Sequence, residues 1–141
     1  SKNPEVVVTI ETKGIPIALM TADALGLPLV IIRRGSRVTE GSSVSINYVS
    51  GSSKRIQTMS LPRRALEPGR RVILIDDFMK AGGTARGMMD LMAEFEAEVV
   101  GIGVLVEAAA DKGTKLVENY RSLLCLQELD PEMGKTCVLP V

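Results

Sequence analysis

The stretch VILIDDFMKAGGT, residues 72–84, indicates the fold most clearly. Its first four residues are an uninterrupted apolar run rich in β-branched side chains, which is typical of a strand buried on both faces in a parallel sheet. The residues after Thr84 carry helix-forming side chains and an apolar stripe, so a helix is predicted from about Ala85 to Phe95. The order is therefore strand, acidic turn, glycine-bearing loop and helix.

Asp76 and Asp77 follow this strand, and Gly82 and Gly83 precede the helix. Glycines let the backbone approach a ligand, the N–H groups at a helix start bind phosphate, and Thr84 adds a hydroxyl or caps the helix. Carboxylates suit the diol of a ribose, or a divalent cation bound with it. Each feature alone is typical of a solvated turn or a tight loop, but together they predict a site for a ribose 5-phosphate.

A second unit of the same kind lies near the start of the chain. Glu5 to Ile10 is a predicted strand, and a helix is predicted through about Leu25, with Pro16 near its start and Gly26 at its end. The turn between them, residues 11–14, is a second candidate anion site to which Lys13 adds a positive charge. The alternative is an ordinary turn with a solvated lysine.

A third short strand, Leu29 to Ile32, ends in two arginines. An arginine that leaves a strand at the carboxyl edge of a sheet reaches a phosphate in bidentate fashion. Neighbouring residues of an extended segment point in opposite directions, so one arginine faces the site and the other faces solvent. Arg33 is the predicted ligand, and Arg34 the solvent-facing residue.

Residues 41–60 change in character. Val44 to Tyr48 and Ile56 to Ser60 alternate between apolar and polar residues, which predicts an antiparallel hairpin with a flexible tip. Its tip carries Lys54 and Arg55, which with Tyr48 are candidate contacts to a ligand. A basic surface hairpin without such a role is the alternative.

The remaining segments complete an α/β pattern. Further strands are predicted at Glu98 to Val106, Leu123 to Leu126 and Thr136 to Leu139, and a short helix at Asp111 to Asn119. Glu107 follows the first of these strands, where it either touches a ligand or caps the next helix. Strands that alternate with helices predict a doubly wound, mostly parallel sheet with its site at the carboxyl edge.

The amino-acid composition excludes several classes of function. The chain has 141 residues, which suits one domain, and its formal net charge is zero, which argues against a general electrostatic grip on nucleic acid. Histidine is absent, which excludes imidazole catalysis. Cys125 and Cys137 lack the spacing of metal ligands and are expected to be reduced thiols. With no membrane-length apolar segment, a cytoplasmic domain without a membrane partner is expected.

Residues 73–84 resemble the phosphoribosyl diphosphate (PRPP) motif of the type I phosphoribosyltransferases. More narrowly, they resemble the effector domains of the purine operon repressors of Gram-positive bacteria. The resemblance extends over residues 11–18, 33–64 and 101–109, and so over nearly the whole chain. It implies the type I phosphoribosyltransferase fold for residues 1–141, with a flexible hairpin that closes over bound PRPP.

The resemblance also implies roles for the candidate residues. Asp76 and Asp77 would hold the ribose of PRPP, directly or with Mg²⁺ bound through the ribose or water, and Tyr48, Lys54 and Arg55 would contact the ligand from the flexible hairpin. The pyrophosphate would lie against Thr12, Lys13, Gly14 and Arg33, in a turn that often carries a cis peptide in this family. We predict backbone strain there. The 5′-phosphate would lie against Lys80, Ala81, Gly82, Gly83 and Thr84.

Two functions fit such a site. One is a purine phosphoribosyltransferase, a salvage enzyme of the adenine or xanthine type. The other is a PRPP-binding sensor without catalysis, which Lys80 and Ala81 favour, because many of the enzymes have an acid or small residue and then Thr or Ser at these positions. A scaffold with a vestigial site that binds no PRPP is a third reading.

The sensor hypothesis carries expectations for the whole protein. The chain is expected to be a piece of a longer repressor of purine biosynthesis genes, in which an N-terminal winged helix, absent from this chain, binds DNA and PRPP lowers the affinity for DNA. A homodimer is typical of the family.

Overall fold

The apolar runs of the sequence form the inner strands of one mixed sheet. The computed structural model describes residues 3–35, 41–50, 55–108, 117, 119–130 and 135–140, and for 127–130 and 135–140 it describes the backbone alone. Along these residues the elements are, in order, β1 (Val6–Ile10), α1 (Ile15–Leu25), β2 (Leu29–Arg34), β3 (Ser43–Val49), β4 (Ile56–Pro62), the 3-10 turn η1 (Arg63–Ala65), β5 (Arg71–Met79), α2 (Gly83–Glu94), β6 (Glu98–Ala108), β7 (Arg121–Asp130) and β8 (Lys135–Pro140).

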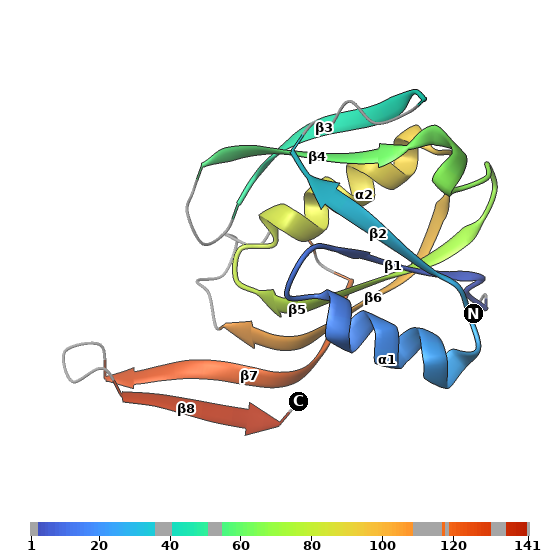
Figure 1. Cartoon of the computed structure of the whole chain (residues 1–141). Helices are drawn as coiled ribbons and strands as arrows, with labels where there is room; N and C mark the ends of the chain where they lie inside the picture. The colour runs from blue at the N-terminus through green and yellow to red at the C-terminus, as the bar shows by residue number, and fades with distance from the viewer. Residues whose placement is uncertain are drawn as a thin grey trace.

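The strands formed by the described residues pair in the order β3-β4-β2-β1-β5-β6-β7-β8. Strands β2, β1, β5, β6 and β7 run parallel, whereas β4 pairs antiparallel with β2, β3 with β4, and β8 with β7. The parallel strands β1 and β5 lie side by side near the centre of the sheet (Figure 1). Because each is followed by a loop and a helix, the two loops meet at the same edge of the sheet.

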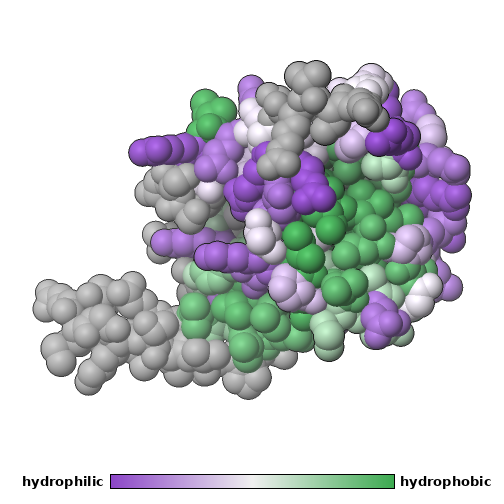
Figure 2. All heavy atoms as spheres, in the orientation of Figure 1, coloured by the Kyte–Doolittle hydropathy of each residue, from purple (hydrophilic) through white to green (hydrophobic). Residues whose placement is uncertain are grey.

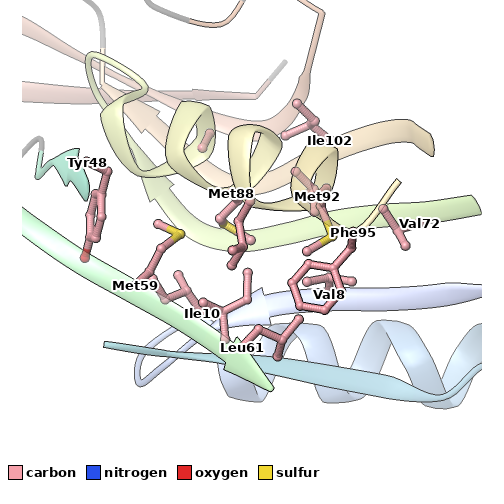
Figure 3. Packing of buried hydrophobic residues seen from close by; sticks show 14 of the residues in the cluster. Val8, Ile10, Tyr48, Met59, Leu61, Val72, Met88, Met92, Phe95 and Ile102 are labelled. Atoms are coloured by element: carbon pink, nitrogen blue, oxygen red, sulfur yellow. The ribbon is translucent and has the colours of Figure 1, made fainter. Parts of the chain in front are cut away.

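Helices α1 and α2 cover opposite faces of the sheet. Successive residues of β1 point to opposite faces, so Val7 packs with Ala18 and Ala22 of α1, while Val8 belongs to the larger cluster that contains Met88 of α2. Figure 3 shows this larger cluster between α2 and the sheet. Its side chains are aliphatic and sulfur-containing apart from two aromatic residues, as expected for a chain with few aromatics.

The hairpin of β3 and β4 extends the sheet beyond β2 and packs against α2 (Figure 1). At the contact, a Cβ atom on Gly87 of α2 would lie 2.7 Å from Tyr48 Cβ and 2.8 Å from Met59 Cε. Glycine therefore allows the hairpin to approach the helix backbone, and the hairpin contributes Tyr48, Met59 and Leu61 to the core. The predicted antiparallel hairpin is confirmed, with each strand two residues longer than predicted.

The predicted α/β class with a mostly parallel sheet is confirmed, and so are the ends of α1, where Pro16 stands in the first turn and Gly26 adopts a left-handed conformation at the C-cap. One local prediction was wrong: Asp76 and Asp77 lie within β5, which continues to Met79, and not in a turn. The main-chain pairing with β6 continues past the apolar run, with Asp76 opposite Val104.

Other predictions concern the carboxyl-terminal third. The two strands predicted around residues 123 and 136 are β7 and β8. The helix predicted for residues 111–119 falls mostly outside the described residues. Of the two cysteines, Cys125 is a free thiol, and the side chain of Cys137 lies outside the described set. Within the part of the chain that the structure describes, no helix is long and apolar enough to cross a membrane.

Candidate functional site

A cavity of about 660 Å³ opens where the loops after β1 and β5 meet, a size that suits a small-molecule ligand. The residues that line it come from the end of β1 and its loop, from the ends of β2 and β3, from the end of β5 and its loop, from the start of α2, and from β6. These are Ile10, Glu11, Thr12, Lys13, Gly14, Arg34, Ser50, Asp76, Asp77, Phe78, Met79, Lys80, Gly82, Gly83, Thr84, Ala85 and Val104.

The acidic pair lies in the wall of this cavity. Strand β5 carries Asp76 and Asp77 to the carboxyl edge of the sheet, where the Asp77 N–H donates to Asp76 Oδ1 at 2.9 Å. Burial, together with the neighbouring Asp77, raises the pKa of Asp76 to about 7, although the Arg34 guanidinium acts in the opposite direction. Asp76 therefore changes its charge near neutral pH, and both carboxyl groups can accept hydrogen bonds from ligand hydroxyls.

The start of α2 forms the next part of the wall. Gly82 adopts a left-handed conformation with φ of +89° and is the N-cap, so α2 begins at Gly83, two residues before the predicted start. No side chain of a described residue caps the helix. Of the two roles that the sequence left open for Thr84, a cap or an added hydroxyl group, the cap is excluded, because Thr84 is the second residue of α2. The first N–H groups of α2 have no partner within the helix, and they face a cavity that Lys80 also lines.

Among the predicted residues of this loop, Ala81 does not line the cavity. The other four, namely Lys80, Gly82, Gly83 and Thr84, do so. This segment therefore offers a lysine ammonium group, a threonine hydroxyl and main-chain donors, which together suit an anion.

The loop after β1 faces the start of α2 across the cavity. The peptide bond between Glu11 and Thr12 is cis, at the start of the turn that the sequence singles out. The Ile15 N–H donates to the Thr12 carbonyl oxygen at 3.2 Å, which closes the turn in front of α1. Thr12, Lys13 and Gly14 all line the cavity, and Lys13 is exposed to it. This arrangement brings a second positively charged loop to the acidic pair.

The two arginines at the end of β2 are placed opposite to the prediction. Arg34, and not Arg33, is among the described residues that line the cavity. The Arg34 Nε–H donates to the Glu11 carbonyl oxygen at 2.8 Å, while Arg33 forms an exposed ion pair with the Glu11 carboxylate at 3.3 Å. The side of β2 on which each arginine lies depends on its pairing with β1 and β4, and the local sequence contains no signal for that choice.

Of the three hairpin residues predicted to touch a ligand, the two that the structure describes, Tyr48 and Arg55, do not line the cavity. Tyr48 is only 5% exposed, and its hydroxyl group accepts from Arg34 Nη1 and donates to Gln57 Oε1, each at 3.0 Å. Burial raises the pKa of Tyr48, which keeps its hydroxyl group protonated. Arg55 is exposed outside the described wall, and Lys54 lies outside the described residues.

Glu107 lies at the carboxyl end of β6 but does not belong to the described wall of the cavity. Its carboxylate accepts hydrogen bonds from the hydroxyl groups of Tyr120 and Ser122, the latter at 2.7 Å. The sequence left open whether Glu107 touches a ligand or caps the next helix. The structure instead shows contact with residues at the start of β7, and the helix that Glu107 was to cap lies mostly outside the described residues.

Sequence reasoning missed several wall residues. Ser50 follows β3 and belongs to the wall, although the sequence marks it only as part of a small-residue tip. Phe78 and Met79 end β5 between the acidic pair and Lys80, so their place beside the site could have been inferred from the motif itself. Val104 reaches the site only through the pairing of β6 with β5, which local sequence does not reveal.

Comparison with known proteins gives a consistent family. The model of the phosphoribosyl transferase domain matches residues 1–134. The purine biosynthesis transcriptional repressor PurR of Bacillus subtilis is 57% identical over 126 residues, which are 89% of this chain and 44% of that protein. The purine biosynthesis transcriptional activator PurR of Lactococcus lactis is 45% identical over 92% of this chain and 47% of its own length. The chain thus spans about half the length of these relatives.

Enzymes are also similar. A xanthine phosphoribosyltransferase of Lactococcus lactis is 34% identical over 95% of this chain and 70% of its own length. Among solved structures, the adenine phosphoribosyltransferase of Rhodothermus marinus matches with a TM-score of 0.77 at 27% identity, over 89% of this chain and 71% of that one. That of Thermoanaerobacter pseudethanolicus has the same TM-score at 21% identity, over 87% and 71%, and so supports the fold alone.

Proposed function

Because the chain belongs to the phosphoribosyl transferase domain family, we propose that its cavity binds PRPP as an effector and that the chain is the sensor domain of a transcriptional repressor of purine biosynthesis genes. The observation that carries this proposal is the position of the acidic pair between two loops that suit anions. A ribose with a phosphate or diphosphate group at each end needs carboxylates for its hydroxyls in the middle and an anion-binding loop on either side.

In this proposal, Asp76 and Asp77 accept hydrogen bonds from the ribose hydroxyls. The 5′-phosphate binds the main-chain N–H groups of the loop before α2, with Lys80 as its counter-charge. The diphosphate group lies at the opposite end of the cavity, against the loop of residues 12–14. Arg34 takes the place that the sequence assigned to Arg33, since Arg34 lines the wall at that loop.

Two observations support a sensor over a salvage enzyme. Ala81 supplies no hydroxyl group to the phosphate loop, and the Glu107 carboxylate at the end of β6 is engaged by Tyr120 and Ser122 and lies outside the described wall. The relatives named as regulators are also more similar to this chain than the xanthine enzyme is. The overall likeness to that enzyme keeps a purine phosphoribosyltransferase as the second candidate.

The residues fit Mg²⁺ only together with the ligand. Among the described residues, no group of three or more His, Cys, Asp or Glu side chains gathers as a metal site. Asp76 and Asp77 supply carboxylate oxygens, and Mg²⁺ is commonly held by one or two carboxylates with substrate phosphates and water. When bound, the ion would neutralise charge on the diphosphate, while the two aspartates hold the ribose.

Since the chain spans about half of its regulatory relatives, the DNA-binding activity is proposed for the whole protein. An N-terminal winged-helix domain outside this sequence would bind DNA, and PRPP in the cavity would lower the affinity for DNA. We propose a cytoplasmic homodimer, which the exposed Leu19, Met20 and Leu25 of α1 support. Figure 2 shows a broad hydrophobic area on the face that carries β2 and α1.

Titration calorimetry with PRPP, with and without Mg²⁺, tests the proposed site. We expect saturable binding that is lost when Asp76→Ala and Asp77→Ala are combined. Unchanged affinity in that variant would refute the site. Asp90→Ala is a matched control, because Asp90 forms an exposed ion pair with Arg86 on α2, outside the described wall.

A second experiment separates sensor from enzyme. Incubation of the protein with PRPP and adenine, guanine, hypoxanthine or xanthine is expected to release no pyrophosphate. Appreciable turnover with any base would establish the salvage enzyme instead. The control is a reaction with a known adenine phosphoribosyltransferase under the same conditions.

The regulatory part requires DNA. Gel shift with purine operator DNA is expected to be negative for this chain and positive for a full-length protein, with the shift reduced by PRPP. A full-length protein that binds the operator equally well with saturating PRPP would contradict the sensor role while leaving the binding site intact.

A further inference from the structure

Arg34 connects three parts of the molecule through its side chain. Its Nε–H donates to the Glu11 carbonyl oxygen at 2.8 Å, on the residue before the loop of residues 12–14. Its Nη1 donates to the Tyr48 hydroxyl and to Gln57 Oε1, each at 3.0 Å, on the two strands of the hairpin. One guanidinium group therefore ties the loop after β1 to the hairpin of β3 and β4.

The guanidinium group of Arg34 donates to neutral oxygen atoms, while the Glu11 carboxylate accepts from the Arg34 main-chain N–H at 2.7 Å. Among the described residues, no carboxylate forms an ion pair with the guanidinium group. Its hydrogen bonds to described residues use Nε and Nη1, and the Nη2 edge of the guanidinium bonds none of these residues. Arg34 also lines the cavity beside Thr12 and Lys13. Arg34 therefore presents a positive charge, which also acts on the Asp76 carboxylate, at the end of the cavity assigned to the diphosphate. The N–H donors of its Nη2 atom bind no described residue.

The two hairpin partners are themselves held in place. Tyr48 is 5% exposed, belongs to the core cluster and packs on Gly87 of α2 (Figure 3). Its hydroxyl group donates to Gln57 Oε1 at 3.0 Å, so the two side chains form a triangle with Arg34. Fixing a long arginine side chain in one rotamer costs conformational entropy. Because Tyr48 and Gln57 already fix Arg34 in the free protein, ligand binding does not have to supply that free energy.

We propose that Tyr48 and Gln57 are positioning residues, which hold Arg34 so that its free edge receives the diphosphate group of the ligand. This inference rests on the proposed function and adds to it that Tyr48 and Gln57 contribute to affinity without touching the ligand. The sequence assigned Tyr48 to direct contact, whereas its hydroxyl group acts through Arg34.

The test compares two ligands that differ in the group concerned. PRPP carries the diphosphate, and ribose 5-phosphate lacks it, so only PRPP can reach the free edge of Arg34. We expect Tyr48→Phe and Gln57→Leu each to raise the Kd for PRPP by about fivefold to tenfold, as for the loss of one ordinary hydrogen bond, with the Kd for ribose 5-phosphate unchanged. A merely structural role of these residues would weaken both ligands alike.

Two further variants complete the design. Thr58→Val removes the neighbouring cross-strand hydrogen bond from Thr58 Oγ1 to Asn47 Oδ1, 3.0 Å long and on the other face of the hairpin, and is expected to leave both Kd values unchanged. Arg34→Met is expected to abolish the effect of Tyr48→Phe, so that the double variant binds PRPP as weakly as Arg34→Met alone.

Three outcomes decide the matter. Selective weakening of PRPP binding, together with non-additivity in the double variant, supports the inference. Wild-type affinity for PRPP in both Tyr48→Phe and Gln57→Leu overturns it and leaves the proposed function standing. A wild-type protein that binds neither ligand overturns the proposed function and this inference together.

Discussion

Asp76 Oδ1 lies 2.7 Å from the point that a Cβ atom on Gly14 would occupy. Thr9 Oγ1 lies 2.5 Å from the same point, so the end of β5 and the loop after β1 meet with no room for a methyl group between them. Neither contact is with the far end of a long, flexible side chain. Residue 14 must therefore be glycine for the acidic pair to lie beside the loop after β1.

Gly14→Ala is expected to weaken PRPP binding by about tenfold or more and to lower the free energy of unfolding by about 1–3 kcal/mol, because the added methyl group displaces Asp76 or the loop. Calorimetry and urea denaturation measure the two effects. Gly101→Ala is the matched control, because its Cβ would lie 3.6 Å from Ile73 Cδ1, an ordinary van der Waals distance. Wild-type binding by Gly14→Ala would show that the two loops can separate freely.

Thr9→Val tests the buried hydroxyl group beneath the same loop. Thr9 is fully buried and its Oγ1 atom has no hydrogen-bond partner among the described residues. Because valine has nearly the same shape, we expect the free energy of unfolding to rise by up to about 1 kcal/mol. Thr9→Ser keeps the hydroxyl group, loses a buried methyl group and is expected to be less stable than wild type. A clear loss of stability in Thr9→Val would instead reveal a hydrogen bond made by this hydroxyl, for example to buried water.

The raised pKa of Asp76 predicts a pH dependence of stability. Its pKa is about 7 in the folded protein, against 3.8 for the free side chain, so the folded state retains a proton that the unfolded state has lost between these values. The contribution of Asp76 to the free energy of unfolding is therefore largest below about pH 4 and decreases as the pH rises toward 7. Above pH 7 it no longer changes. Asp76→Asn is expected to lose less stability than wild type between pH 5 and 8 in urea denaturation. Equal losses in the two proteins would place the pKa of Asp76 near its ordinary value.

The parts of the site that depend on local chain order were predictable. The glycine loops, the acidic pair and Lys13 lie where two strand–loop–helix units place them, and the parallel pairing of β1 with β5 brings the two units together. The choice between Arg33 and Arg34 was not predictable, because it depends on how β2 pairs with β1 and β4. The same holds for Asp76, which pairing with β6 keeps within a strand although the apolar run has ended.

Gly87→Ala tests the contact between α2 and the hairpin. Alanine favours a helix over glycine by about 1 kcal/mol, which alone would stabilise the protein. Its Cβ atom would lie 2.7 Å from Tyr48 Cβ, which cannot move without the strand, so we expect a net loss of about 1–3 kcal/mol in the free energy of unfolding. Combining it with Met59→Leu is expected to give little rescue. An increase in Tm for Gly87→Ala would mean that the hairpin can move away from α2 at little cost in free energy.

Met20→Glu tests the proposed homodimer. Met20 is 70% exposed on α1, so a charge there should not disturb the fold but should oppose burial against a second copy. Sedimentation velocity is expected to show a dimer for wild type and a monomer for the variant, at equal Tm in dilute solution. A wild type that remains monomeric at high concentration would refute the dimer, and a variant that remains dimeric would place the interface elsewhere.

The contact between Tyr48 and Gly87 has a consequence for how this chain can be shortened or recombined. Strands β3 and β4 look like a peripheral insertion when only the parallel strands are considered, yet they shield one side of α2 from water. Replacing them with a short linker would expose that helix and remove the acceptors that hold Arg34. A shortened version of the domain therefore has to keep the hairpin of β3 and β4 for its stability, whatever the hairpin contributes to ligand binding.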